Sequence, residues 1–268
     1  MHTVLIGSIA IFLYLIAAIL LGMRLNRRLT APRVKWQALA IAFAAVSLHG
    51  WLVFQFLFTG SGLNFGVTSA FSLISWLISL LLIFSALGQP TENLGIIVFP
   101  ITALATLVET LFGGTSHITN VSDTTIEIHI LISIMAYSML SIAAVQAILL
   151  AIQDRHLRNR HPGGFVRALP PLQTMETLLF QMIAVGFVLQ SLALISGIMF
   201  LDDIFAQHLV HKTVLSIIAW AVFAILLWGR WRFGWRGRTA IRWTMTGFVA
   251  LVLSYLGSKV VLELVLGR

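Results

Sequence analysis

The sequence predicts an all-α fold, a polytopic membrane bundle of eight transmembrane helices. Three observations carry this prediction: 59% of the 268 residues are hydrophobic, only 10% are charged, and the mean hydropathy is +0.98. Because so few charged side chains cannot cover a water-facing surface, most residues must face lipid or one another. A soluble fold is therefore excluded.

Eight apolar stretches are each long enough to cross a hydrocarbon core of about 30 Å, which takes about 20 helical residues. They lack the alternation of polar and apolar residues that a membrane β-barrel needs. We expect the helices at roughly residues 3–23, 37–58, 67–87, 94–112, 127–152, 174–200, 210–229 and 241–265. The first stretch has no basic residue ahead of it and no cleavage site after it, so we expect a retained span.

Basic residues are confined to connections that alternate onto one side of these helices. The connections at 24–35, 155–167 and 230–242 hold 14 of the 17 Lys and Arg residues. The positive-inside rule places such loops in the cytoplasm, and both termini then lie on the outer, periplasmic side. The net charge of +8 thus reflects topology, and we expect no nucleic-acid partner.

The longest connection separates the fifth and sixth stretches without forming a domain of its own. It contains Pro162, Gly163, Gly164, Pro170 and Pro171, which are typical of loops. We therefore expect residues 1–268 to form a single integral membrane domain.

His49 lies inside the second stretch, roughly 14 residues beyond Lys35 and about 20 Å above the cytoplasmic edge at about 1.5 Å per residue. An ionisable group at that depth is costly unless it faces the bundle interior and has a partner. Two interpretations stay open, a single interhelical hydrogen bond or a functional ligand or gate. Trp51, two residues further on, is the tryptophan best placed to line a cavity.

His129 opens the fifth stretch and shares a helical face with Ser133 and Tyr137. A small, polar face of this kind suits a buried helix interface. We expect this face to lie near the outer side of the membrane.

Three further histidines lie on the same expected side. His208 and His211 are three residues apart at the start of the seventh stretch and share a face if that segment is helical, and His117 lies in the loop before the fifth stretch. A histidine pair at a helix end is also common without any ligand. The other histidines, His2 and those of the basic 155–167 segment, are expected at the surface.

Neutral imidazole is a common ligand for haem iron, zinc and copper. Two imidazoles from different helices could hold a haem, whereas zinc usually needs a third or fourth ligand, which Glu127, Asp202 and Asp203 could supply. Cysteine is absent, which excludes thiolate metal sites and covalent haem attachment to this chain through a Cys-X-X-Cys-His motif. Since no nucleophile or acid-base pair emerges either, we expect a binding protein rather than an enzyme.

The chain resembles the CcsA/HemX-type cytochrome c assembly proteins, and within them the short inner-membrane branch called HemX or YpjD. The resemblance is carried by LNFGVTSAFSLISWLISLLL in the third stretch, by HILISIMAYSMLSIAAVQAILLAIQDRHL in the fifth, and by GWRGR ahead of a final apolar stretch. It covers nearly the whole chain and includes the eight-span layout.

Larger members of this family carry haem across the membrane and present it to apocytochrome c. The resemblance therefore implies a haem-binding or haem-trafficking accessory protein in cytochrome c assembly, a multi-pass protein of the bacterial cytoplasmic (inner) membrane. His129 matches the family's outer histidine, and His49 resembles the histidine buried in an early span. We expect non-covalent, b-type haem with iron ligated by His129 and His211, and with His49, His208 and Trp51 as further contacts.

The chain also departs from the haem-presenting members. It has FLDDIFAQHLVHK where they carry a tryptophan-rich WGxxWxWD segment, and Trp228 stands where they have a later intramembrane histidine. Their last outer histidine has no counterpart near GSKVVLELVLGR, and we assign its role to His211 from position alone. Expected partners are haem, membrane lipid, and cytochrome assembly proteins or a haem-synthesis enzyme.

Two alternatives come from other functional classes. In a small-solute or ion transporter, His49 and Glu109 would be buried polar groups along the transport path. Broken helices and inverted repeats, the usual signs of a transporter site, are in short supply in the sequence. In a regulatory or scaffolding subunit without a cofactor, the histidines would only pack.

Overall fold

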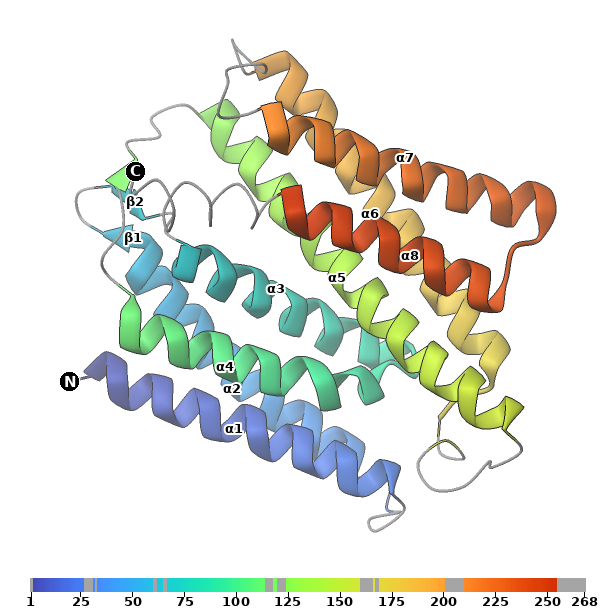
Figure 1. Cartoon of the computed structure of the whole chain (residues 1–268). Coiled ribbons are helices and arrows are strands. Elements are labelled where there is room, and N and C mark those ends of the chain that lie inside the picture. Colours follow the sequence, from blue (N-terminus) through green and yellow to red (C-terminus); the bar gives the residue numbers. More distant parts are fainter. Residues whose placement is uncertain are drawn as a thin grey trace. The chain divides into compact units, whose positions relative to one another are not determined.

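The computed structural model describes residues 2–26, 31, 33–59, 62–64, 67–113, 118–119, 124–159, 166, 169–200 and 210–254. In chain order the elements are α1 (His2–Leu25), α2 (Arg33–Leu57), β1 (Phe58–Thr59), β2 (Gly62–Asn64), α3 (Val67–Gly88), η1 (Glu92–Leu94), α4 (Gly95–Phe112), β3 (Ile118–Thr119), α5 (Thr124–Arg158), α6 (Leu172–Phe200), α7 (Val210–Phe233) and α8 (Gly237–Val252) (Figure 1). All long elements are helices, which confirms the predicted fold class.

Seven helices within the described ranges are long and apolar enough to cross a membrane, and they match the first seven predicted stretches. Their bounds are His2–Leu25, Arg33–Phe56, Thr68–Gly88, Glu92–Phe112, Ile128–Arg158, Leu172–Met199 and Lys212–Phe233. Helix α8 has 16 residues, or about 24 Å, which is less than the hydrocarbon thickness of about 30 Å. The rest of the predicted 241–265 span lies outside the described residues, so the eighth span and the outer position of the termini stay predictions.

The chain divides into two compact units, each considered by itself. Unit 1 comprises Met1–Val121 with His156–Pro171, and unit 2 comprises Ser122–Arg155 with Leu172–Arg268. The single domain expected over residues 1–268 stays a prediction.

Unit 1 is a bundle of α1 to α4, in which α1 packs against α2 and α4, and α3 packs against the same two helices (Figure 1). Small residues allow the close approach of α1 and α4: a Cβ atom at Gly7 would lie 2.6 Å from the Thr110 Oγ1 atom. The strands form a small antiparallel sheet in the order β1-β2-β3, with Leu63 opposite both Phe58 and Thr119. The sequence did not predict this sheet, because its strands are only two or three residues long.

A buried carboxylate ties together the end of unit 1 that carries its basic residues. Glu92 is 7% exposed, and its Oε1 and Oε2 atoms lie 2.8 Å from Arg24 Nη1 and 3.4 Å from Lys35 Nζ. Because Arg24 lies in the last turn of α1 and Lys35 in the first turn of α2, the two ion pairs hold both helix ends against η1. Both basic residues lie in the connection that the sequence assigns to the cytoplasm.

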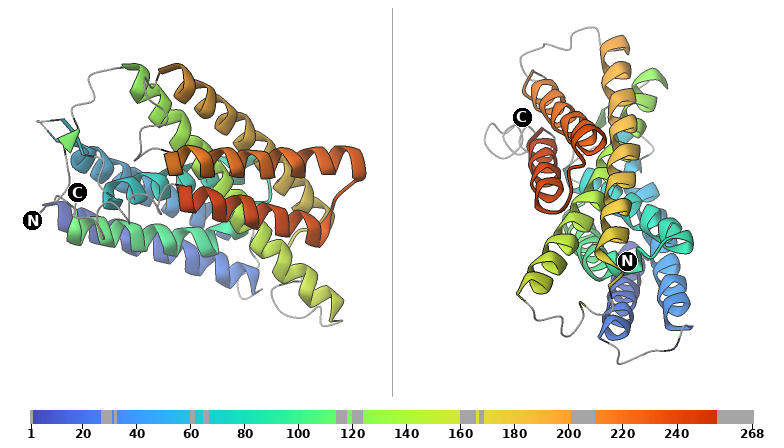
Figure 2. Two further views of the ribbon diagram at one scale, coloured as in Figure 1. Left: turned by 45° about the horizontal axis from the view of Figure 1, so that its top comes forward. Right: turned by 90° about the vertical axis from the view of Figure 1, so that its right-hand side faces the viewer.

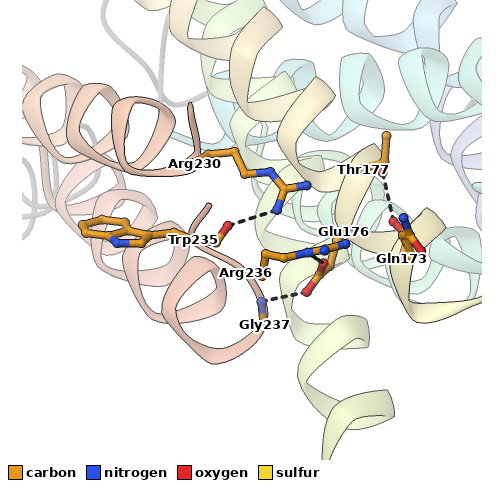
Figure 3. Close-up of polar contacts among 7 residues, drawn as sticks. All are labelled: Gln173, Glu176, Thr177, Arg230, Trp235, Arg236 and Gly237. Atoms are coloured by element: carbon orange, nitrogen blue, oxygen red, sulfur yellow. Dashed lines mark hydrogen bonds and ion pairs between the residues drawn. The ribbon is translucent and has the colours of Figure 1, made fainter. Parts of the chain in front are cut away.

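In unit 2, α7 and α8 form a hairpin through a short turn, and α6 packs against α7 (Figure 2). The turn needs glycine, since Gly234 and Gly237 have φ angles of 67° and 52° in the left-handed region. Glu176 of α6 accepts hydrogen bonds from the Gly237 backbone N–H at 2.7 Å and from Arg236 Nε at 3.0 Å (Figure 3). The GWRGR motif therefore forms a turn whose helix start is capped by a carboxylate from a different helix.

Candidate functional site

His129 lies in the first turns of α5 in unit 2, half-buried against α6. Its Nδ1 atom is 2.9 Å from Ser196 Oγ, and the Ser196 hydroxyl donates to the Ala193 carbonyl oxygen at 3.0 Å. Because the serine proton is used by that carbonyl, Ser196 Oγ accepts a proton from Nδ1–H. This arrangement suits the neutral tautomer that keeps a lone pair on Nε2, the form that binds a metal.

The helical face predicted for His129 is polar and connects three helices of unit 2. Tyr137, eight residues further along α5, donates from its hydroxyl to Ser254 Oγ at 3.4 Å. Ser254 donates to the Lys212 carbonyl oxygen of α7 at 2.9 Å and shares a 2.7 Å hydrogen bond with Ser216 Oγ. Residue 211 is the direct neighbour of Lys212, so this chain of hydrogen bonds joins the face of α5 that carries His129 to the start of α7.

The structure describes the other predicted outer residues only in part. His211 is the second residue of α7, but its side chain lies outside the described residues, as does the side chain of Glu127. His117, His208 and the acidic pair 202–203 lie outside them entirely. Within the described part of the chain, no group of three or more His, Asp or Glu side chains gathers to hold a metal ion. The expected grouping of His129 with His211 stays a prediction.

His49 is fully buried at the centre of unit 1. Its Nδ1 atom is 3.3 Å from Tyr14 Oη of α1, and its Nε2 atom is 2.9 Å from Ser72 Oγ of α3. Thr106 Oγ1 of α4 lies 3.3 and 3.4 Å from the two ring nitrogens. Both ring nitrogens are therefore engaged by hydroxyl groups, and iron ligation at His49 would require one of these hydrogen bonds to open.

Trp51 lies on the outward side of α2 and is 43% exposed. Its neighbour along the same helix, Phe54, is 56% exposed. An exposed aromatic residue on a membrane helix faces lipid, which is a common position for tryptophan near the interface. A haem contact at Trp51 stays a prediction.

Sequence reasoning missed the residues that orient both histidines. Ser196 is a single hydroxyl in an apolar stretch, and nothing in its spacing connects it to His129, 67 residues earlier. The partners of His49 were easier to predict from the sequence. Ser69, Ser72, Ser75 and Ser79 recur at intervals of three and four residues in the third stretch. That stripe predicts a polar helix face, although it does not say which helix the face meets.

Comparison with known proteins places these features in a family. The sequence profile described as Cytochrome C assembly protein matches residues 36–266. The inner membrane protein YpjD of Escherichia coli (strain K12) is 34% identical over 238 residues, which cover 86% of this chain and 89% of that protein. No solved structure matches the chain.

More distant relatives match parts of the chain. Protein HemX of Brevibacillus brevis is 22% identical over 131 residues, 48% of each chain. The cytochrome c biogenesis protein CcsA of Gloeobacter violaceus is 30% identical over 87 residues, which cover 32% of this chain and 26% of that protein. The resemblance to CcsA, HemX and YpjD is thus confirmed.

The location follows from the same comparison together with the fold. A protein of the inner membrane shares most of its length with this chain, and seven described helices can cross a membrane. The chain is a multi-pass protein of the bacterial inner membrane, and it belongs to the cytochrome c assembly protein family.

Proposed function

We propose that this protein is a haem-binding or haem-trafficking accessory protein in cytochrome c assembly, with haem ligated non-covalently by histidines near the outer face of the membrane. The observation that carries the proposal is the 2.9 Å hydrogen bond between His129 Nδ1 and Ser196 Oγ. Because Ser196 favours a proton on Nδ1, the lone pair of Nε2 is available for iron. Family membership supplies the connection to cytochrome c biogenesis.

The second iron ligand in this proposal is His211, with His208 as a further contact. The support is the hydrogen-bonded chain from Tyr137 of α5, eight residues after His129, through Ser254 to the carbonyl oxygen of Lys212, the residue after His211. Two neutral imidazoles suit a b-type haem, whose iron supplies redox chemistry when it is bound. The residues of this chain hold and orient the haem, and reversible ligation suits an accessory protein that passes it on.

His49 and Trp51 enter the proposal as a deeper contact. Since both nitrogens of His49 are hydrogen-bonded, haem there must displace the hydroxyl of Ser72 or Tyr14. That exchange costs part of the interhelical hydrogen bonding of unit 1. We therefore expect His129 and His211 to dominate haem binding at equilibrium, with His49 making a minor contribution.

The experiment is an absorption spectrum of the purified protein from haem-replete cells. We expect a Soret band that is strongly reduced in His129→Ala and His211→Ala and unchanged in His156→Ala, a matched control in the segment assigned to the cytoplasm. A colourless wild-type preparation, or a full Soret band in the double variant of His129 and His211, would contradict the proposal.

The proposed partners follow from the same function. They are membrane lipid and a second protein, either a cytochrome assembly protein or an enzyme of haem synthesis. Crosslinking in native membranes, followed by mass spectrometry, is expected to recover one of these two classes. Recovery that is equal for wild-type protein and the double histidine variant would favour a scaffolding role that does not depend on haem.

A further inference from the structure

A continuous seam of polar side chains runs between α3 and α4 in unit 1. Helix α3 contributes four serines and helix α4 two threonines and a glutamate, and each of the seven is 4% exposed or less. These residues are Ser69, Ser72, Ser75, Ser79, Thr102, Thr106 and Glu109. The two helices run in opposite directions, so the pairs stack along the seam.

Contacts across the seam define its order. Ser79 and Thr102 share a hydrogen bond of 2.7 Å, while Ser69 donates to Glu109 Oε1 at 2.9 Å. Between these two pairs, Ser72 and Thr106 both reach His49. Glu109 therefore lies one helical turn from the hydroxyls that contact His49, on the side away from η1.

Glu109 is buried with one carboxyl oxygen unsatisfied. The residue is 2% exposed, Oε1 accepts the Ser69 hydrogen bond, and Oε2 has no hydrogen-bond partner among the residues that the structure describes. Glu92, the other buried glutamate of unit 1, differs because Arg24 and Lys35 pair with its carboxylate. Arg24 and Lys35 lie at the η1 end of unit 1, whereas Glu109 lies toward the other end of α4.

Hydrogen bonds between hydroxyl groups hold membrane helices together without any ligand. This role is enough to explain the serines and threonines of the seam. The carboxyl group does not fit that explanation, because burying an unpaired carboxylate costs several kcal/mol and apolar or hydroxyl side chains would pack as well. A proton on the carboxyl group removes the charge and most of that cost.

Among the described residues, no lysine or arginine side chain pairs with Glu109. Helix α1 presents Tyr14 and, at its exposed start, His2, and helix α2 presents His49. Helix α3 carries no ionisable side chain, and Glu109 is the only one within α4 itself. His117 and Asp123 follow α4 and lie outside the described residues.

We propose that Glu109 is a proton-binding site inside unit 1. Its carboxyl group holds a proton at neutral pH, and Ser69, Ser72 and Thr106 lie between it and His49. The proposal does not depend on haem binding by His129 and His211, which belong to unit 2.

Infrared difference spectroscopy of the full-length protein in lipid tests the proposal, because the C=O stretch of a protonated carboxyl group is separate from carboxylate bands. We expect wild type minus Glu109→Gln to show a protonated carboxyl band that shifts in heavy water. Wild type minus Glu92→Gln, the matched control, is expected to show carboxylate bands. Carboxylate bands for Glu109 at neutral pH would overturn the proposal, and so would their appearance on adding sodium at constant pH, since Glu109 would then be a cation site.

A second measurement needs no variant and so does not depend on the folding of Glu109→Gln. Dicyclohexylcarbodiimide adds to a protonated carboxyl group: the acid proton goes to one nitrogen and the carboxyl oxygen to the central carbon. The O-acylisourea then rearranges to a stable N-acylurea with no leaving group. We expect mass spectrometry to find this adduct on Glu109 and not on Glu92. Modification of both or of neither contradicts the proposal.

Discussion

At the scale of single residues, the hydroxyl groups that hydrogen-bond to each imidazole determine which of its ring nitrogens can bind a metal. Ser196 Oγ lies 2.9 Å from His129 Nδ1 and donates its own proton to the Ala193 carbonyl oxygen, which favours a proton on Nδ1. The same chemical group at Ser72 has the opposite effect on His49, where it engages Nε2 and removes that nitrogen from metal binding. Nδ1 of His129 therefore has one hydroxyl partner, whereas both ring nitrogens of His49 lie within hydrogen-bonding distance of hydroxyl groups.

Replacing Ser196 by alanine tests the role of the tautomer. Loss of this acceptor frees the imidazole to rotate and to change tautomer, and changes of this kind typically weaken metal binding about 10- to 100-fold. Titration of haemin into purified Ser196→Ala is expected to show a loss in that range, smaller than the loss in His129→Ala. Ser141→Ala is the control, because its hydroxyl bonds only the Tyr137 carbonyl. Equal affinity in Ser196→Ala and wild type would remove the basis for the assigned tautomer.

Replacing His49 by leucine tests the hydrogen-bonding centre of unit 1. The change leaves the hydroxyls of Tyr14 and Ser72 without their imidazole partner in a buried site, at a cost of roughly 1–3 kcal/mol. We expect a lower midpoint of thermal unfolding in detergent, partly restored in His49→Gln, which keeps hydrogen-bonding groups. Ser47→Ala on the exposed side of the same helix is the control. A His49→Leu protein as stable as wild type would mean that these hydrogen bonds contribute little.

At the scale of elements, the start of α8 shows how a motif acquires its structure. The sequence predicted the last apolar stretch from residue 241, yet the helix begins at Gly237. The polar residues of its first turn are tolerated because Glu176 accepts the Gly237 N–H and binds Arg236 (Figure 3). In addition, Asp154 Oδ2 lies 3.5 Å from Arg238 Nε. Carboxylates from α5 and α6 thus extend the helix beyond its apolar part.

Gly237→Ala tests the left-handed turn. A Cβ atom there would meet no described atom closer than Glu176 Oε1 at 3.9 Å, so the cost is backbone strain of roughly 1–2 kcal/mol. We expect a lower unfolding midpoint in detergent. Gly22→Ala is the matched control, because a Cβ at this helical position meets nothing within 4 Å and alanine favours the helix by about 1 kcal/mol. A lower midpoint in the control and not in Gly237→Ala would contradict this account.

At the scale of the whole molecule, the distribution of charge predicts the orientation in the membrane. Because the chain has no cysteine, a single introduced cysteine can be labelled without reaction at a native thiol. His2→Cys is expected to react with a membrane-impermeant maleimide on spheroplasts. Trp231→Cys, at a position that is 82% exposed beside the α7–α8 turn, is expected to react only after permeabilisation. The reverse pattern would invert the topology and place the His129 end of α5 in the cytoplasm.

The sequence by itself determined the membrane class, seven of the helices, and the family. These features are local: a membrane helix satisfies its backbone hydrogen bonds within one segment, so length and hydrophobicity are enough to identify it. Histidine positions could also be read directly, which is why His49 and His129 were candidates from the outset.

Only the tertiary structure decided what those histidines meet. It paired His129 with Ser196 and His49 with hydroxyls of three other helices, left Trp51 exposed, and brought Glu176 to the start of α8. A side chain's partner depends on which helices are neighbours and how each is rotated about its axis. Hydropathy cannot supply that information, because the lipid-facing and protein-facing sides of a membrane helix are both apolar.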